Sequence, residues 1–130
     1  MIIADSDVLI DFLRGGNAGA RRIALELTTR SLCTTAITAF EIRSGAHSAR
    51  QRKAVEALLA AVTILPLGAD EAKVAAELRQ RLDGAGQPIG MADYLIAAIC
   101  LANDGVLLTR NRKHFVRVAE LKLSGVEARD

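Results

Sequence analysis

The sequence predicts an α/β fold in which a central parallel sheet of four to five short strands is flanked by helices. Short apolar segments of strand length alternate with longer segments whose apolar residues recur at helical spacing. The composition is 51% hydrophobic but only 3% aromatic, so the core must consist mainly of Ala, Leu, Ile and Val. Aliphatic cores of this kind are typical of helices packed on a parallel sheet.

The expected elements follow one another in a regular order. A strand at 2–4 precedes a short helix at 8–13, which ends before two glycines. The segment 91–102 is the most apolar helix, so we expect it to be buried on most sides. Further strands are expected at 32–35, 62–65, 106–108 and within 121–126, and further helices at 18–29, 38–49, 53–61, 70–82 and 111–118.

Length and cysteine content set the expected class of protein. A chain of 130 residues is long enough for one domain with a real core, so we expect a single domain over 1–130. Cys33 and Cys100 lie in apolar segments without C-x-x-C spacing, which favours buried free thiols over a disulfide or zinc site.

The sequence gives no sign of targeting or membrane insertion. No charged segment precedes an apolar one at the N-terminus, and the longest uncharged stretch, 57–69, is broken by Pro66 and Gly68. That stretch is also shorter than the ~20 apolar residues that a membrane-spanning helix needs. We therefore expect a soluble, cytoplasmic protein that makes no contact with a membrane.

Three acidic residues are expected at one edge of the sheet. Asp5 directly follows the first strand, Glu41 lies in the helix after the second strand, and Asp93 lies in the first turn of the most apolar helix. The carboxyl ends of parallel strands meet at one edge, where ligands bind in open α/β sheets. Carboxylates gathered there repel one another unless a cation lies among them, and their oxygens suit Mg²⁺ or Mn²⁺.

The chemistry expected of such a site is the hydrolysis of phosphate esters. A metal ion held by carboxylates polarises a phosphoryl oxygen and lowers the pKa of a bound water molecule, while a free carboxylate orients that water. A net charge of +2 is compatible with a polyanionic substrate such as RNA.

Each acid also has a purely structural explanation. Thr38 and Glu41 fit the spacing of a capping box. Asp5 or Ser6 fits an N-cap, and Asp93 is favoured by the helix dipole in a first turn.

Four motifs follow one another along the chain. They are IIADSDVLI at 2–10, TAFEIRSG at 38–45, IGMADYLIAA at 89–98 and LTRNRKHF at 108–115. In these motifs the sequence resembles the PIN-domain family and, more narrowly, the VapC-type toxins of bacterial and archaeal toxin–antitoxin pairs. The likeness covers nearly the whole chain, and the third motif is its most specific part.

The resemblance implies a Mg²⁺-dependent endoribonuclease that is usually a homodimer and is silenced by a small antitoxin protein. Carried over to this chain, Asp5, Glu41 and Asp93 form the acidic site, with Asp5 and Asp93 as the principal metal ligands. Asn111 stands where many members have a further acid, and it can accept a hydrogen bond or ligate without bringing charge. Asp7 stands where an Asn is common, so it is a candidate to compensate for Asn111.

Several basic residues lie close in sequence to the expected site. They are candidates for contacts with RNA phosphates, although solvated charges on exposed helices are an equally good interpretation. Aromatic residues are few, so we expect contacts with phosphates rather than stacked bases to dominate. The basic candidates are Arg43, Arg110, Arg112, Lys113 and Arg117.

Two other functions remain open from the sequence. One is a haloacid-dehalogenase-like phosphatase with Asp5 as nucleophile, although the chain lacks the late paired acids of that family. The other is a PIN-like module that binds RNA or protein without cutting, because Asn111 brings no charge. Detection of a phospho-aspartate would favour the first, and RNA binding without cleavage would favour the second.

Overall fold

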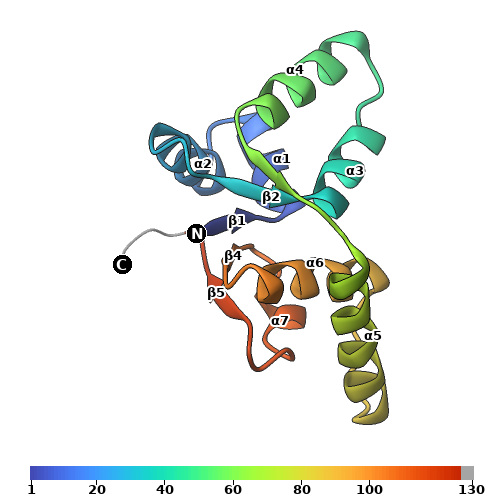
Figure 1. The fold of residues 1–130 in the computed structure, drawn as a ribbon. Helices are drawn as coiled ribbons and strands as arrows, with labels where there is room; N and C mark the ends of the chain where they lie inside the picture. The colour runs from blue at the N-terminus through green and yellow to red at the C-terminus, as the bar shows by residue number, and fades with distance from the viewer. Residues whose placement is uncertain (127–130) are drawn as a thin grey trace.

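The computed structural model describes residues 1–126, whose five strands form one parallel sheet in the order β3-β2-β1-β4-β5. The predicted fold class is confirmed, with the higher of the expected strand numbers (Figure 1). The strands are β1 (Ile2–Ala4), β2 (Cys33–Thr35), β3 (Thr63–Leu65), β4 (Val106–Leu108) and β5 (Lys122–Ser124).

Helices cover both faces of the sheet, each face over its own apolar core. Four helices lie on one face, namely α1 (Ser6–Arg14), α2 (Ala18–Thr28), α3 (Ala36–Ser44) and α4 (Ala49–Ala60). Three lie on the other, as Figure 1 shows, namely α5 (Ala69–Gly84), α6 (Met91–Ala102) and α7 (Arg112–Phe115).

Alternating side chains of the central strands divide between the two cores. Ile3 and Leu107 are register partners on β1 and β4, and both belong to the core beneath α5, α6 and α7. Ala4 and Leu108 are the next pair along, and both belong to the core beneath α1–α4. Because these four residues are fully buried, β1 and β4 hold the residues that follow their carboxyl ends in a fixed position.

Several helices begin at residues other than the expected ones, because their N-cap residues differ from those that the sequence indicates. The helix expected at 8–13 begins at Ser6, since Asp5 is its N-cap. The helix expected at 38–49 begins at Ala36, since the Thr35 hydroxyl accepts a hydrogen bond from the Thr38 N–H at 3.0 Å. The proposed capping box of Thr38 and Glu41 is therefore wrong.

Two further boundaries follow from local hydrogen bonding. Ser48 and Gln51 form a capping box that starts α4 at Ala49 rather than at 53, so α3 has already ended at Ser44. The helix expected at 111–118 is the single turn Arg112–Phe115.

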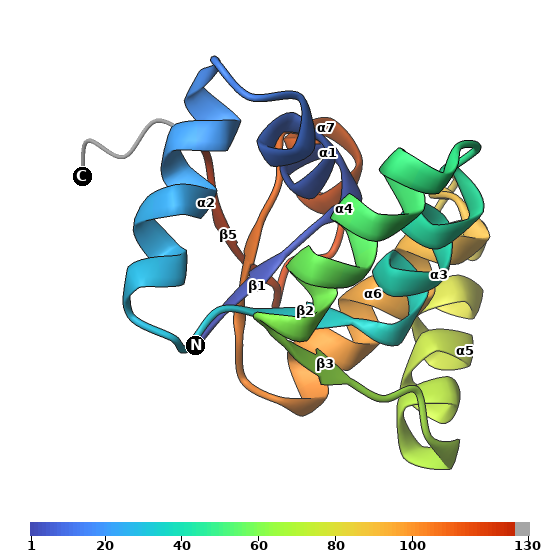
Figure 2. The ribbon, with the colours of Figure 1, turned by 90° about the horizontal axis from the view of Figure 1, so that it is seen from above.

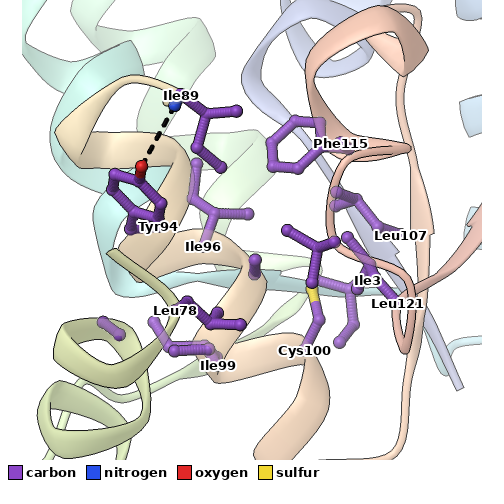
Figure 3. Close-up of a cluster of buried hydrophobic side chains, with 14 of the residues drawn as sticks. Ile3, Leu78, Ile89, Tyr94, Ile96, Ile99, Cys100, Leu107, Phe115 and Leu121 are labelled. Atoms are coloured by element: carbon purple, nitrogen blue, oxygen red, sulfur yellow. Dashed lines mark hydrogen bonds between the residues drawn. The ribbon is translucent and has the colours of Figure 1, made fainter. Parts of the chain in front are cut away.

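The core under α6 fixes the segment that leads into this helix. Figure 3 shows the Tyr94 hydroxyl accepting a hydrogen bond from the backbone N–H of Ile89 (3.2 Å), close to Ile96 and Phe115. The same hydroxyl donates to Asp83 at the end of α5 (2.6 Å). These bonds hold the loop before α6 and thereby set where the first turn of α6 lies.

Both cysteines are free and buried, as predicted. Within residues 1–126, no helix has the length and apolar character needed to cross a membrane.

Candidate active site

The candidate active site lies where the chain leaves β1 and β4. These two strands are neighbours in the sheet (Figure 2). From β1 the chain continues to β2 on one side, and from β4 it continues to β5 on the other side. The carboxyl ends of β1 and β4 are therefore a topological switch point of the sheet. The N–H of Asp5 donates to the carbonyl of Leu108 at 3.0 Å. Asp5 Oδ2 accepts a hydrogen bond from the Thr109 hydroxyl at 2.7 Å, which ties the two strand ends together.

Asp5 is a buried carboxylate with an unusual proton affinity. It caps α1 by accepting a hydrogen bond from the Ser6 N–H at 2.8 Å, so the expected structural role is confirmed. The pKa of Asp5 is raised to about 6, chiefly by burial and to a smaller extent by the charges of Asp7 and Asp93, while the hydrogen bonds from the Thr109 hydroxyl and the Ser6 N–H oppose the shift. A capping role alone does not require burial of the charge among other acids.

Asp7 is a second acid at the start of α1. Its Oδ2 accepts hydrogen bonds from the Arg110 N–H at 3.0 Å and from the Thr109 hydroxyl at 3.4 Å. Its Oδ1 is buried and has no hydrogen-bond partner within residues 1–126. Burial raises the pKa of this carboxyl.

Glu41 and Asp93 reach the same region from α3 and α6. The charge of Asp93 raises the pKa of both Asp5 and Glu41, although burial is the larger cause in each case. Burial likewise raises the pKa of Asp93. Glu41 Oε1 is buried without a hydrogen-bond partner in the described part of the chain. The three predicted acids are thus close enough to influence one another, although Asp5 follows β1 and the other two come from α3 and α6.

Asn111 borders the site through its neighbours. Its backbone N–H donates to the Thr109 hydroxyl at 2.9 Å, and its side-chain nitrogen lies 3.3 Å from His114 Nδ1. That His114 nitrogen is 3.6 Å from Asp93 Oδ2. Asn111 therefore connects with the acids by way of Thr109 and His114.

The residue chemistry fits a hard divalent cation. Four carboxylates gather at one place, and two of them carry buried oxygens without partners, which is costly unless something else pairs with them. As the side chains stand, no group of three His, Cys, Asp or Glu side chains within residues 1–126 forms a ready-made metal cluster. The donors are those that Mg²⁺ prefers, and its binding would require their side chains to draw together.

An ion pair that the sequence did not suggest supports the turn after β4. The Arg110 guanidinium donates to both oxygens of Asp11, at 2.7 and 3.1 Å. Asp11 is buried against Gly19 of α2, where an added Cβ atom would clash with the Asp11 carboxylate. Asp11 lies one helical turn after Asp7, and this spacing is the only feature of the sequence that places Asp11 on the same side of α1 as Asp7. Arg110 is therefore engaged within the protein.

The other basic candidates divide into two groups. Arg43 pairs with Glu56 at 2.9 Å, and Arg117 donates to the Pro88 carbonyl at 2.6 Å. Arg112 and Lys113 are exposed at the start of α7 and form no ion pair within residues 1–126. Of the five basic candidates, these two are the most available to an incoming phosphate.

A partly apolar cavity of about 640 Å³ lies beside the acids. Among the acids discussed above, only Glu41 lines it, so the cavity and the acid site meet at this residue without coinciding. The walls come from α1, α3, α4 and the connection between α3 and α4, and include Ile10, Leu13, Arg14, Ile42, Arg50 and Val55.

The raised pKa of Asp5 predicts a stability that falls as pH rises. Between about pH 4 and pH 6 this carboxyl keeps its proton in the folded protein and loses it in the unfolded chain, so the free energy of unfolding decreases across that window. In EDTA, the free energy of unfolding of the parent, measured by urea denaturation, should fall between about pH 5 and pH 7.5. In Asp5→Asn, which has no carboxyl to titrate at this position, the fall should be smaller by about 1 kcal/mol. Equal losses in the two proteins would show that Asp5 ionises normally.

The chain is similar to known proteins over nearly its whole length. A family model described as PIN domain matches residues 2–121. Ribonuclease VapC10 of Mycobacterium tuberculosis is 34% identical over 122 residues, which cover 94% of this chain and 91% of that protein. Ribonuclease VapC19 of the same species is 29% identical over 123 residues, with 94% and 98% covered.

Solved structures with the same fold include two toxin–antitoxin complexes. VapBC-1 from nontypeable Haemophilus influenzae matches with a TM-score of 0.84 at 25% identity and covers 97% of this chain and 98% of that one. VapBC2 from Rickettsia felis, bound to a DNA fragment from its promoter, also gives a TM-score of 0.84, at 22% identity, with 96% and 98% covered. At 22% identity, this second match shows the fold alone.

Proposed function

The chain belongs to the PIN-domain family, among its VapC-type members, and on this premise we propose that it is the toxin of a type II toxin–antitoxin system and cleaves RNA. The observation that carries the proposal is the gathering of the buried Asp5 with the half-buried Asp7, Glu41 and Asp93 near the carboxyl ends of β1 and β4. The haloacid-dehalogenase alternative is set aside, because the PIN model accounts for residues 2–121.

The proposed cofactor is Mg²⁺, with Mn²⁺ as a substitute, held by Asp5, Asp93 and Glu41. When bound, such an ion polarises a phosphoryl oxygen of RNA and lowers the pKa of a water molecule. The buried and unpartnered Oε1 of Glu41 suits either ligation or orientation of the attacking water. Thr109 keeps Asp5 in place through its 2.7 Å hydrogen bond, and Asn111 completes the proposed catalytic set beside His114.

The proposed substrate contact is electrostatic. Arg112 and Lys113 lie next to Asn111 and are exposed, so we propose that they bind phosphates of the RNA near the scissile bond. In the part of the chain that the structure describes, the large exposed apolar side chains within two residues of Glu41 or Asp93 are Phe40 and Met91, which agrees with a small role for base stacking.

The proposed partners are an antitoxin protein and a second copy of this chain. The cavity of about 640 Å³ combines an apolar lining with Arg14 and Arg50, and it reaches the acids at Glu41. An antitoxin segment with apolar and acidic residues would fill it and cover the site. Phe40 and Met91, 67% and 69% exposed, are candidates for the contact with a second copy.

A cleavage assay on a mixed RNA pool tests the proposed activity. The purified protein, free of any antitoxin, should cut RNA in Mg²⁺ or Mn²⁺ and lose this activity in EDTA, because the carboxylates alone neither polarise the phosphate nor supply an activated water. Cleavage that persists unchanged in EDTA would contradict the metal mechanism. RNA binding without cleavage under any condition would instead support the non-catalytic module.

A further inference from the structure

We infer that Asp7 is a ligand of the divalent cation and supplies the fourth carboxylate of the site, where Asn111 brings none. The inference rests on the proposed function and deepens it by naming a residue of the same site. Three features of the structure carry it: the free oxygen of Asp7, its place among the other acids and the way its carboxylate is held.

The two oxygens of Asp7 have different environments. Oδ2 accepts from the backbone N–H of Arg110 and lies near the Thr109 hydroxyl, so it is already paired. Oδ1 is shielded from water and makes no hydrogen bond of ordinary geometry within residues 1–126, although the nearby Val8 N–H opposes the rise in the pKa of this carboxyl. A buried carboxylate oxygen without a partner is costly, and a cation is the partner that removes this cost in a site of several acids.

The carboxylate of Asp7 lies among the acids of the site rather than apart from them. Asp7 stands two residues after Asp5, in the first turn of α1. Asp7 shares the Thr109 hydroxyl with Asp5, at 3.4 and 2.7 Å respectively. A cation that contacts Asp5 would therefore also lie close to the carboxylate of Asp7.

The orientation of Asp7 is set by a supported peptide group. The Arg110 N–H that binds Oδ2 belongs to a residue whose guanidinium is fixed by two hydrogen bonds to the buried Asp11. Partners that orient ligands in this way are typical of metal sites. Asn111 lacks this arrangement, because its N–H is bound to Thr109 and its side-chain nitrogen faces His114.

Titration of the protein with Mn²⁺ alone, followed by calorimetry, tests the inference. Asp7→Asn should weaken Mn²⁺ binding at least about tenfold, since it removes one negative charge and places an amide nitrogen where Oδ1 lies. The amide oxygen of asparagine still accepts from the Arg110 N–H, so the fold should be kept. Asp7→Ser, which retains a hydroxyl acceptor, is a second variant with the same expected result.

Asp104→Asn is the matched control. Asp104 is an exposed acid paired with Lys122, so its replacement removes one negative charge without touching the site and should leave Mn²⁺ affinity unchanged. Parental affinity in folded Asp7→Asn or Asp7→Ser would overturn the role of Asp7 and leave the proposed function standing. Absence of Mn²⁺ binding by the parent would overturn the proposed metal site itself, and with it this inference.

Discussion

Replacing Asp93 by asparagine is expected to lower the rate of RNA cleavage at least about 100-fold without unfolding the protein. Asp93 reaches the acids from the first turn of α6, and its charge is felt by both Asp5 and Glu41. Asparagine has nearly the same shape but neither the charge nor the second carboxylate oxygen. The side chain is only partly buried, so its loss leaves no cavity in the core.

Single-turnover cleavage rates and urea denaturation together measure this effect. Asp70→Asn is the control, because Asp70 is also an acid in the first turn of a helix but is exposed on α5, away from the site. The control should cut RNA at the parental rate. If Asp93→Asn also cut at that rate, Asp93 would have no part in the site.

Replacing Phe115 by alanine is expected to cost about 3–5 kcal/mol of unfolding free energy, a large share of the roughly 5–15 kcal/mol that stabilises a domain. Phe115 is fully buried and is the only buried residue of α7 (Figure 3). This helix is a single turn, so it holds its position mainly through this ring. Because Asn111 and His114 lie just before Phe115, loss of the ring should also disturb the border of the acid site.

Urea denaturation provides the measurement, with Val116→Ala as the control. Val116 is the next residue and is 56% exposed, so its truncation should change the unfolding free energy by no more than about 0.5 kcal/mol. Similar small losses in both variants would show that α7 does not depend on Phe115.

The arrangement of strands was predictable because it depends on simple patterns. Alternation of short apolar segments and helical segments predicts a parallel sheet, and the structure has one, with Asp5 directly after a central strand. The gathering of Glu41 and Asp93 near Asp5 followed from the rule that carboxyl ends of parallel strands share an edge. Helix starts were less predictable, since Thr35 and Thr38 are both residue types that cap helices well. Thr35 is the N-cap because its backbone is extended and its hydroxyl accepts from the Thr38 N–H, which the sequence does not reveal.

The support around the acids could not be predicted from local patterns. The bond between Thr109 and Asp5 joins residues 104 positions apart, and the pair of Arg110 with Asp11 joins residues 99 apart. Neither leaves a periodic signal, so the sequence alone indicates Arg110 as a candidate RNA contact and not as the partner of Asp11. The unpartnered oxygens of Asp7 and Glu41 likewise depend on packing that only the folded chain provides.

The most direct test of the account compares RNA cleavage by the parent protein and Asp5→Ala in the presence of Mg²⁺. Asp5 is the acid with the deepest burial and stands at the end of β1, so the account predicts cleavage by the parent and none by a folded Asp5→Ala variant. Cleavage at the parental rate by Asp5→Ala would contradict the assignment of the site to the carboxyl ends of β1 and β4.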